Sequence, residues 1–265
     1  MLSISVAAEP IFHIGSFPVT NSIITAWIVI FLFFVVGLIV RKKANVNPKG
    51  FLHAIDWMID FAFTEVEKVV GDKERAKKFF PICGSLFFFI LISNWMGLLP
   101  GIGSLGIWET HNGESILIPL LRPATSDLNF TLAIALFSVL ATHVFGVLLI
   151  GFVNHASKFF NIRGIVRALK HGPMAVIVAI VEFFVGLIET ISEVAKTLSL
   201  ALRLFGNIFA GEVLLIVIYS LASFIVPLPF IFLELLVGIV QATVFAMLVL
   251  VFLKSSTEMH EESHG

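Results

Sequence analysis

Residues 172–226 read GPMAVIVAIVEFFVGLIETISEVAKTLSLALRLFGNIFAGEVLLIVIYSLASFIV, and this mostly apolar stretch decides the fold. As one helix it would run roughly 80 Å at about 1.5 Å per residue, whereas a bilayer core of about 30 Å needs only about 20 helical residues. The stretch therefore predicts a helix that is strongly tilted, bent or broken in a membrane. Pro227 and Pro229 end it, and residues 230–253 supply one more apolar helix.

The composition of the whole chain requires a membrane as its solvent. Of the 265 residues, 58% are hydrophobic and only 13% are charged, which is more apolar surface than a soluble core can hide. The single cysteine, Cys83, excludes a disulfide framework within the chain and a cysteine-based metal cluster. We expect one membrane domain, residues 1–265, with no cofactor, no metal and no nucleic-acid partner.

Three further segments are long enough to span a bilayer and contain no Asp, Glu, Lys or Arg: residues 23–40, 79–100 and 128–153. Between the first two, residues 51–70 place apolar and polar side chains on opposite helical faces, which predicts an amphipathic helix on the membrane surface. The prediction is an all-α polytopic protein with about five membrane-crossing helices, the last two long and strongly tilted. Two upright spans within 173–226 would instead give six passes; Lys254 at the exit favours five.

The placement of basic residues predicts the orientation. Lys and Arg cluster before the second span and after the third, whereas residues 1–21 contain none and residues 101–127 contain only Arg122. By the positive-inside rule the basic loops are cytoplasmic, so the N-terminus lies outside and the C-terminus in the cytoplasm. No basic segment precedes the first apolar run, so we expect no cleaved signal peptide. The absence of a transit peptide favours the plasma (inner) membrane of a bacterium.

A stripe of polar residues follows one face of the 172–226 helix. Residues seven apart nearly superpose in a helix. The members at this spacing are Glu182, Glu189, Lys196 and Arg203, with Glu193 and Asn207 each four residues from one of them. An arginine at a helix centre costs about 2.5 to 3.5 kcal/mol and stays charged. Arg203 therefore either snorkels or pairs permanently with a carboxylate, or it acts on an ion pathway.

Two carboxyl groups lie away from this stripe. Glu212 follows Arg203 by nine residues, which places it on the opposite side of the helix and ~13 Å further along the axis. Glu234 lies on the last helix, with Gln241 seven residues later on the same face. A carboxyl group withdrawn from water can load and release protons, as a relay requires. The alternative for each is a structural interhelical hydrogen bond.

The segment LSLALRLFGNIFAGE, residues 198–212, resembles subunit a of the F-type ATP synthases, the membrane stator component beside the rotating c-ring. Four other segments support the resemblance, which covers nearly the whole chain: FPICGSLFFFILISNWMGLLPG (80–101), PATSDLNFTLAIAL (123–136), LIETISEVAKTLS (187–199) and LELLVGIVQATVFAMLVLVFL (233–253). It implies five crossing helices and the surface helix, with the last two helices oblique against the ring.

The resemblance also implies roles for individual residues. Arg203 is the arginine that faces the ring carboxylates. The outer proton relay involves Glu212 and Glu234, and its further polar residues are Gln241, Asn207, Asp127 and Asn129. The cytoplasmic exit is expected at Glu189, Ser192, Glu193 and Lys196. Many relatives pair one acidic residue with one histidine at the two relay positions, whereas both are glutamate here.

The implied function is that of a proton-translocating, non-catalytic stator subunit. Two half-channels would pass protons to and from the carboxylates of the c-ring and so drive its rotation. The implied partners are the c-ring, the peripheral-stalk b subunits, membrane lipid and protons. ATP chemistry would take place on other subunits.

Other readings of the chain are weaker. A secondary transporter coupling proton movement to a solute also uses buried Arg and Glu, but its usual paired inverted halves are not visible. The tail His260-Glu-Glu-Ser-His264 fits a zinc motif but has no third ligand, so we interpret it as a solvated tail. Residues 101–106 fit G-x-G-x-x-G but follow a span rather than a strand, which indicates a turn. We expect His143 to hydrogen-bond a neighbouring helix.

Overall fold

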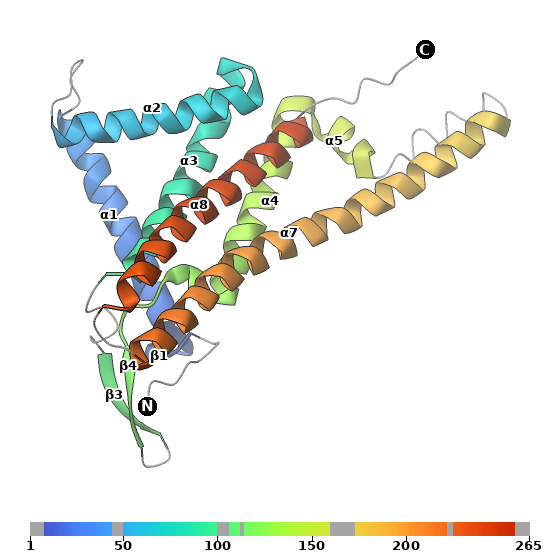
Figure 1. Ribbon diagram of the computed structural model, residues 1–265. Helices are drawn as coiled ribbons and strands as arrows, with labels where there is room; N and C mark the ends of the chain where they lie inside the picture. Colours follow the sequence, from blue (N-terminus) through green and yellow to red (C-terminus); the bar gives the residue numbers. More distant parts are fainter. Residues whose placement is uncertain are drawn as a thin grey trace.

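The computed structural model describes residues 8–43, 50–99, 106–111, 114–159, 173–221 and 225–257 (Figure 1). These ranges contain seven α-helices: α1 (Asn21–Lys43), α2 (Phe51–Val70), α3 (Lys73–Met96), α4 (Leu128–Ile150), α5 (Phe152–Phe159), α7 (Pro173–Leu221) and α8 (Pro227–Thr257). Five of them, α1, α3, α4, α7 and α8, are long and apolar enough to cross a membrane. The prediction of an all-α polytopic membrane protein is confirmed.

Two helix ends, the start of α3 and the end of α4, differ from the ends of the predicted spans because of local capping. α3 begins at Lys73 rather than at residue 79, because the Asp72 side chain accepts a hydrogen bond from the Glu74 N–H at 3.1 Å and caps the helix. α4 ends at Ile150, three residues before the predicted end, and is followed by Gly151 at φ 86°. Pro100, the predicted end of the second span, lies outside the described residues.

Helix α7 is one continuous helix of 49 residues, so the long apolar stretch is not broken in two. It counts as a single candidate span, as the five-pass prediction requires. Figure 1 shows α7 and α8 sloping across the steeper α3 and α4, and the N-terminal half of α7 extending beyond the other helices. The tilt of α7 and α8 relative to a bilayer stays a prediction.

Helix α2 runs across the ends of α1 and α3 that lie furthest from the hairpins (Figure 1). Its C-terminus is closed by Gly71, which at φ 79° adopts the left-handed conformation and donates its N–H to the Glu67 carbonyl at 2.8 Å. Lys254 Nζ donates to the Val69 carbonyl at 3.0 Å and ties this end to α8. A helix at 51–70 is therefore found, and its placement on a membrane surface stays a prediction.

Two antiparallel β-hairpins, which the sequence analysis missed, lie at the opposite end from α2 (Figure 1). The first pairs β1 (Pro10–Ile14) with β2 (Phe17–Thr20), and the second pairs β3 (Gly106–His111) with β4 (Glu114–Pro119). Both occupy segments predicted to lie outside the membrane. Asn21 Nδ2, at the start of α1, donates to the Pro119 carbonyl at 3.2 Å and connects the two segments.

The core lies among α3, α4, α7 and α8. Its largest fully buried side chains include Phe79, Ile90, Leu200, Leu204, Phe245 and Leu250. Burial on this side leaves another face of α7 uncovered, with exposed apolar side chains at Ile191, Val194, Leu198 and Leu202. These four follow one another at intervals of three or four residues and so share one helical face. The middle of α7 therefore packs into the core with one face and has an exposed apolar strip on another.

Candidate functional site

Arg203 lies on α7 with its side chain exposed. In the part of the chain that the structure describes, it has neither a hydrogen-bond nor an ion-pair partner. Its neighbour Leu204 is fully buried in the core. A permanent ion pair with a carboxylate of the described residues therefore does not account for this charge.

Glu212 is paired with a residue to which the sequence analysis gave no role in the site. Arg122 Nε and Nη2 both donate to Glu212 Oε2, at 3.0 and 2.9 Å. The Arg122 side chain is only 6% exposed and the Glu212 side chain 23%. The Arg122 guanidinium also lies 6.0 Å from the centre of the Phe209 ring. The only available signal was that Arg122 is the sole basic residue of its loop.

Glu234 lies on α8 close to Glu212, in a different environment. Its side chain is buried, and its carboxyl group packs against the backbone of Gly211, where a Cβ atom would overlap it. Any side chain at Gly211 would therefore push Glu234 away. Among the described residues Glu234 has no ion-pair partner. The two carboxyl groups predicted for the relay thus differ: Glu212 is ion-paired, whereas Glu234 has no ion pair with a described residue.

Asn207 and Gln241 connect α7 to α8. Asn207 Nδ2 donates to Gln241 Oε1 at 2.7 Å, and Gln241 is buried. Within the described ranges, Gln241 Nε2, Ser93 Oγ and Asn94 Nδ2 are buried side-chain atoms with no hydrogen-bond partner. Buried polar atoms in such positions are usually satisfied by internal water. This part of the helix bundle is therefore suited to hold water.

Asp127 and Asn129 meet at the start of α4. Asp127 is buried and caps the helix by accepting from the Asn129 N–H at 2.9 Å, whereas Asn129 is exposed. The preceding 3₁₀ turn, η2 (Ala124–Ser126), is tied to α3 because Thr125 Oγ1 donates to Asn94 Oδ1 at 2.6 Å. Asp127 therefore has a structural role in addition to the one predicted, and Asn94 and Thr125 are polar neighbours that sequence analysis missed.

Three of the four residues predicted for the cytoplasmic exit share one small cavity: Glu189, Glu193 and Lys196. Lys196 Nζ donates to Glu193 Oε1 at 2.7 Å. Ser192, the fourth, is half-buried and does not line this cavity. His143 of α4 and His155 of α5 complete the cavity wall, with His143 Nδ1 3.1 Å from His155 Nε2. The expected interhelical partner of His143 is therefore found, and its identity could not be read from the sequence.

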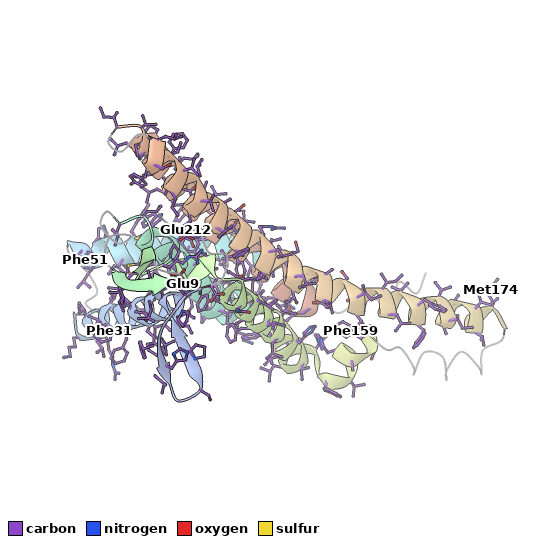
Figure 2. The ribbon with its side chains drawn as sticks, turned by 90° about the horizontal axis from the view of Figure 1, so that it is seen from below. Glu9, Phe31, Phe51, Phe159, Met174 and Glu212 are labelled. Carbon is purple, nitrogen blue, oxygen red and sulfur yellow. The ribbon has the colours of Figure 1, made fainter. Side chains whose placement is uncertain are left out.

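The Arg122–Glu212 pair and the cavity around Glu193 lie on either side of Arg203 along α7. Glu212 follows Arg203 by nine residues and Glu193 precedes it by ten, which corresponds to ~13 and ~15 Å of helix. Figure 2 shows Glu212 of α7 well apart from Phe159 of α5, whose ring contacts the two histidines. An exposed cation thus separates two partly buried polar clusters.

Comparison with known proteins shows the family. The family described as ATP synthase A chain matches residues 23–254. This chain belongs to that family. Relatives named ATP synthase subunit a include one from Trichlorobacter lovleyi, 32% identical over 90% of this chain and 87% of its own length. One from Geobacter sulfurreducens is 31% identical over 90% of this chain and 88% of its own length. One from Moorella thermoacetica is 26% identical over 94% of this chain and 96% of its own length.

Membership in the ATP synthase A chain family confirms the resemblance stated from residues 198–212. Together with the five apolar helices, it makes this chain a multi-pass membrane subunit of an ATP synthase complex. The secondary-transporter alternative has no support from the comparisons. The zinc-like tail at His260–His264 and the glycine-rich residues 101–105 lie outside the described residues.

Proposed function

We propose that this chain is the proton-translocating stator subunit of a rotary ATP synthase, with two half-channels that pass protons to and from c-ring carboxylates. The observation that carries the proposal is the exposed cation of Arg203, placed along α7 between two partly buried polar clusters. Family membership supports it. The chain itself carries out no ATP chemistry.

In this proposal protons enter from the outside and reach the ring beside α7 and α8. Glu234 is the central group of the entry path, with Asn207, Gln241 and internal water beside it. Asp127 and Asn129 lie nearer the outer surface, and Arg122 holds Glu212 in place. Each proton that crosses a potential of 100 mV contributes about 2.3 kcal/mol, so several must pass for each ATP.

Arg203 separates the two half-channels in this proposal. A fixed positive charge in a medium of low dielectric constant attracts each arriving ring carboxylate in its ionised form and repels a proton. A ring carboxylate must therefore release its proton on the cytoplasmic side, near Glu189, Ser192, Glu193 and Lys196, before it passes Arg203. Net proton flow then requires the ring to turn.

The orientation is proposed on the same basis. Both hairpins lie at one end of the bundle, and α2 lies with the C-terminal end of α8 at the other (Figure 1). With the basic residues in the cytoplasm, the N-terminal segment is outside and α8 ends inside, in a bacterial plasma membrane. The peripheral-stalk b subunits and lipid are the expected partners of surfaces away from the ring.

Cross-linking tests whether the exposed strip of α7 faces the ring. With Cys83 replaced by serine, Leu202→Cys should form a disulfide with a cysteine in the outer helix of the c subunit, because Leu202 is 55% exposed on that strip. Phe31→Cys, on α1 and 67% exposed, is the matched control and should not cross-link. Equal cross-linking at both positions, or none at Leu202 in an intact complex, would refute the proposed contact.

The two relay carboxyls should contribute unequally to proton entry. Glu234→Gln should slow proton flux about tenfold or more, since general acid–base groups of this kind typically contribute at least that much. Glu212→Gln should slow it less, because proton uptake at Glu212 first requires separation from Arg122. Flux driven by a potassium diffusion potential through the reconstituted membrane sector measures both. Glu65→Gln, which removes an exposed ion pair to Lys68, is the control and should have little effect.

A further inference from the structure

A small cavity lies where α4, α5, α7 and α8 meet. Its volume is about 30 Å³, enough for one water molecule. Its polar walls include His143, His155, Glu189, Glu193, Lys196 and Ser256. It lies on the Glu193 side of Arg203, so it belongs to the cytoplasmic half of the bundle in the orientation proposed above.

His143 bridges two helices across this cavity. Its Nδ1 lies 3.1 Å from His155 Nε2 on α5, and its Nε2 lies 3.8 Å from Glu193 Oε2 on α7. Both ring nitrogens of His143 therefore face a titratable group. The 3.8 Å distance is longer than a hydrogen bond, and a bridging water or a small side-chain rotation would close it.

The packing around His155 fixes the His143 ring in this orientation. His155 is buried, and its ring occupies the space that a side chain at Gly146 of α4 would fill. The Phe159 ring lies 5.6 Å from both imidazoles, at angles typical of edge-to-face contacts. Glycine at 146 thus allows α5 to bring His155 against α4 beside His143.

We propose that His143 is a proton-transfer residue of the cytoplasmic half-channel and that His155 is the residue that positions its ring. The inference rests on the proposed function. Imidazole gains and loses a proton near neutral pH, which suits it to pass protons between a carboxyl group and water. Glu193, ten residues before Arg203 on the same helix, connects His143 to the ring-facing part of α7.

The transfer moves only a proton. During ATP synthesis the O–H bond of a protonated Glu193 breaks and an N–H bond forms at His143 Nε2, so Glu193 regains its negative charge beside Lys196. The positive imidazolium of His143 then gives the same proton to cavity water and the cytoplasm. ATP-driven pumping runs these steps in reverse.

Several charged groups face His143 and bear on its pH dependence. On α7 they are Glu189, Glu193 and Lys196, and on α5 the described group is His155. From α8 the cavity is lined by Phe252, Ser255 and Ser256, none of which titrates. Lys196 Nζ is bound to Glu193 Oε1 and lies 5.2 Å from the centre of the Phe252 ring.

The test is the pH profile of ATP-driven pumping by the whole complex, in membrane vesicles whose cytoplasmic face points outward. His143→Gln keeps a polar side chain of similar size but cannot relay protons. We expect pumping about tenfold slower than wild type at pH 8, where free protons are scarce, and less than twofold slower at pH 6. His143→Ala should show the same profile, and His155→Gln, which keeps a polar partner for His143, should lose less than threefold.

Ser256→Ala is the matched control, because it removes the 3.0 Å hydrogen bond to the Thr142 carbonyl in the same cavity wall without removing a titratable group. Its effect should not depend on pH. A loss in His143→Gln that is equal at every pH, or no loss at pH 8, would overturn the relay. Arg203→Ala in the same vesicles is the reference: pumping that did not need Arg203 would refute the proposed function itself.

Discussion

Arg203→Ala should abolish ATP-driven proton pumping, with a loss of about a hundredfold or more, while the complex still assembles. The side chain is exposed and lacks a described partner, so its removal leaves no unpaired carboxylate among the described residues. What is lost is the fixed charge that keeps the passing ring carboxylates ionised. Acidification of vesicles on addition of ATP measures the effect, and the amount of c subunit that copurifies measures assembly.

Two variants make this prediction specific to the position and chemistry of Arg203. Lys196→Ala removes another cation from the same helix, one that is bound to Glu193 at the proposed cytoplasmic exit, and should slow pumping without abolishing it. Arg203→Lys keeps a positive charge, but an ammonium can lose its proton in a dry site, so pumping should be weak. Normal pumping in Arg203→Ala would remove this residue from the mechanism.

Arg122→Ala should have the largest effect on stability, because it leaves the Glu212 carboxylate partly buried without its cation. Removal of one partner from a buried ion pair costs about 3 to 5 kcal/mol. Since the Glu212 side chain is 23% exposed, we expect the lower end, about 3 kcal/mol. The thiol of Cys83, which is 2% exposed, reports unfolding: its labelling by a maleimide on heating should begin at a lower temperature in Arg122→Ala.

A double variant separates the ion pair from general packing. Arg122→Leu with Glu212→Leu removes both charges, and replacing a buried pair by apolar side chains is often neutral. The double variant should therefore recover most of the stability lost in Arg122→Ala. The matched single variants Arg122→Leu and Glu212→Leu complete the cycle that gives the coupling energy of the pair. Equal instability in both would mean that Arg122 acts by filling space rather than by holding Glu212.

Features that depend on local sequence were predictable in this chain, and those that depend on distant pairing were not. The apolar run up to Pro227 predicted either one overlong helix or two spans, Lys254 favoured one, and α7 is a single helix. The segment 198–212 predicted the family. The Arg122–Glu212 pair joins residues 90 apart through a loop whose path no periodicity describes. The hairpins escaped notice because their strands have only four to six residues.

The same contrast between local sequence and distant pairing holds for Gln241 and for His155. Gln241 was expected on the same face of α8 as Glu234, because it follows Glu234 by seven residues. The structure also pairs Gln241 with Asn207, a contact between helices that spacing along one helix does not reveal. His155 lies in a segment interpreted only as part of a basic loop, and its approach to His143 depends on the tight packing at Gly146.

The central claim is that Arg203 keeps the two half-channels apart, and it is tested most directly by proton flux with the ring held still. The Leu202→Cys disulfide to the ring would block rotation in proteoliposomes, and a potassium diffusion potential would drive protons. With Arg203 present, the locked complex should conduct almost no protons. The locked Arg203→Ala complex should conduct protons at a measurable rate. If the locked Arg203→Ala complex conducted no more protons than the locked complex with Arg203, that result would contradict the proposed role of Arg203.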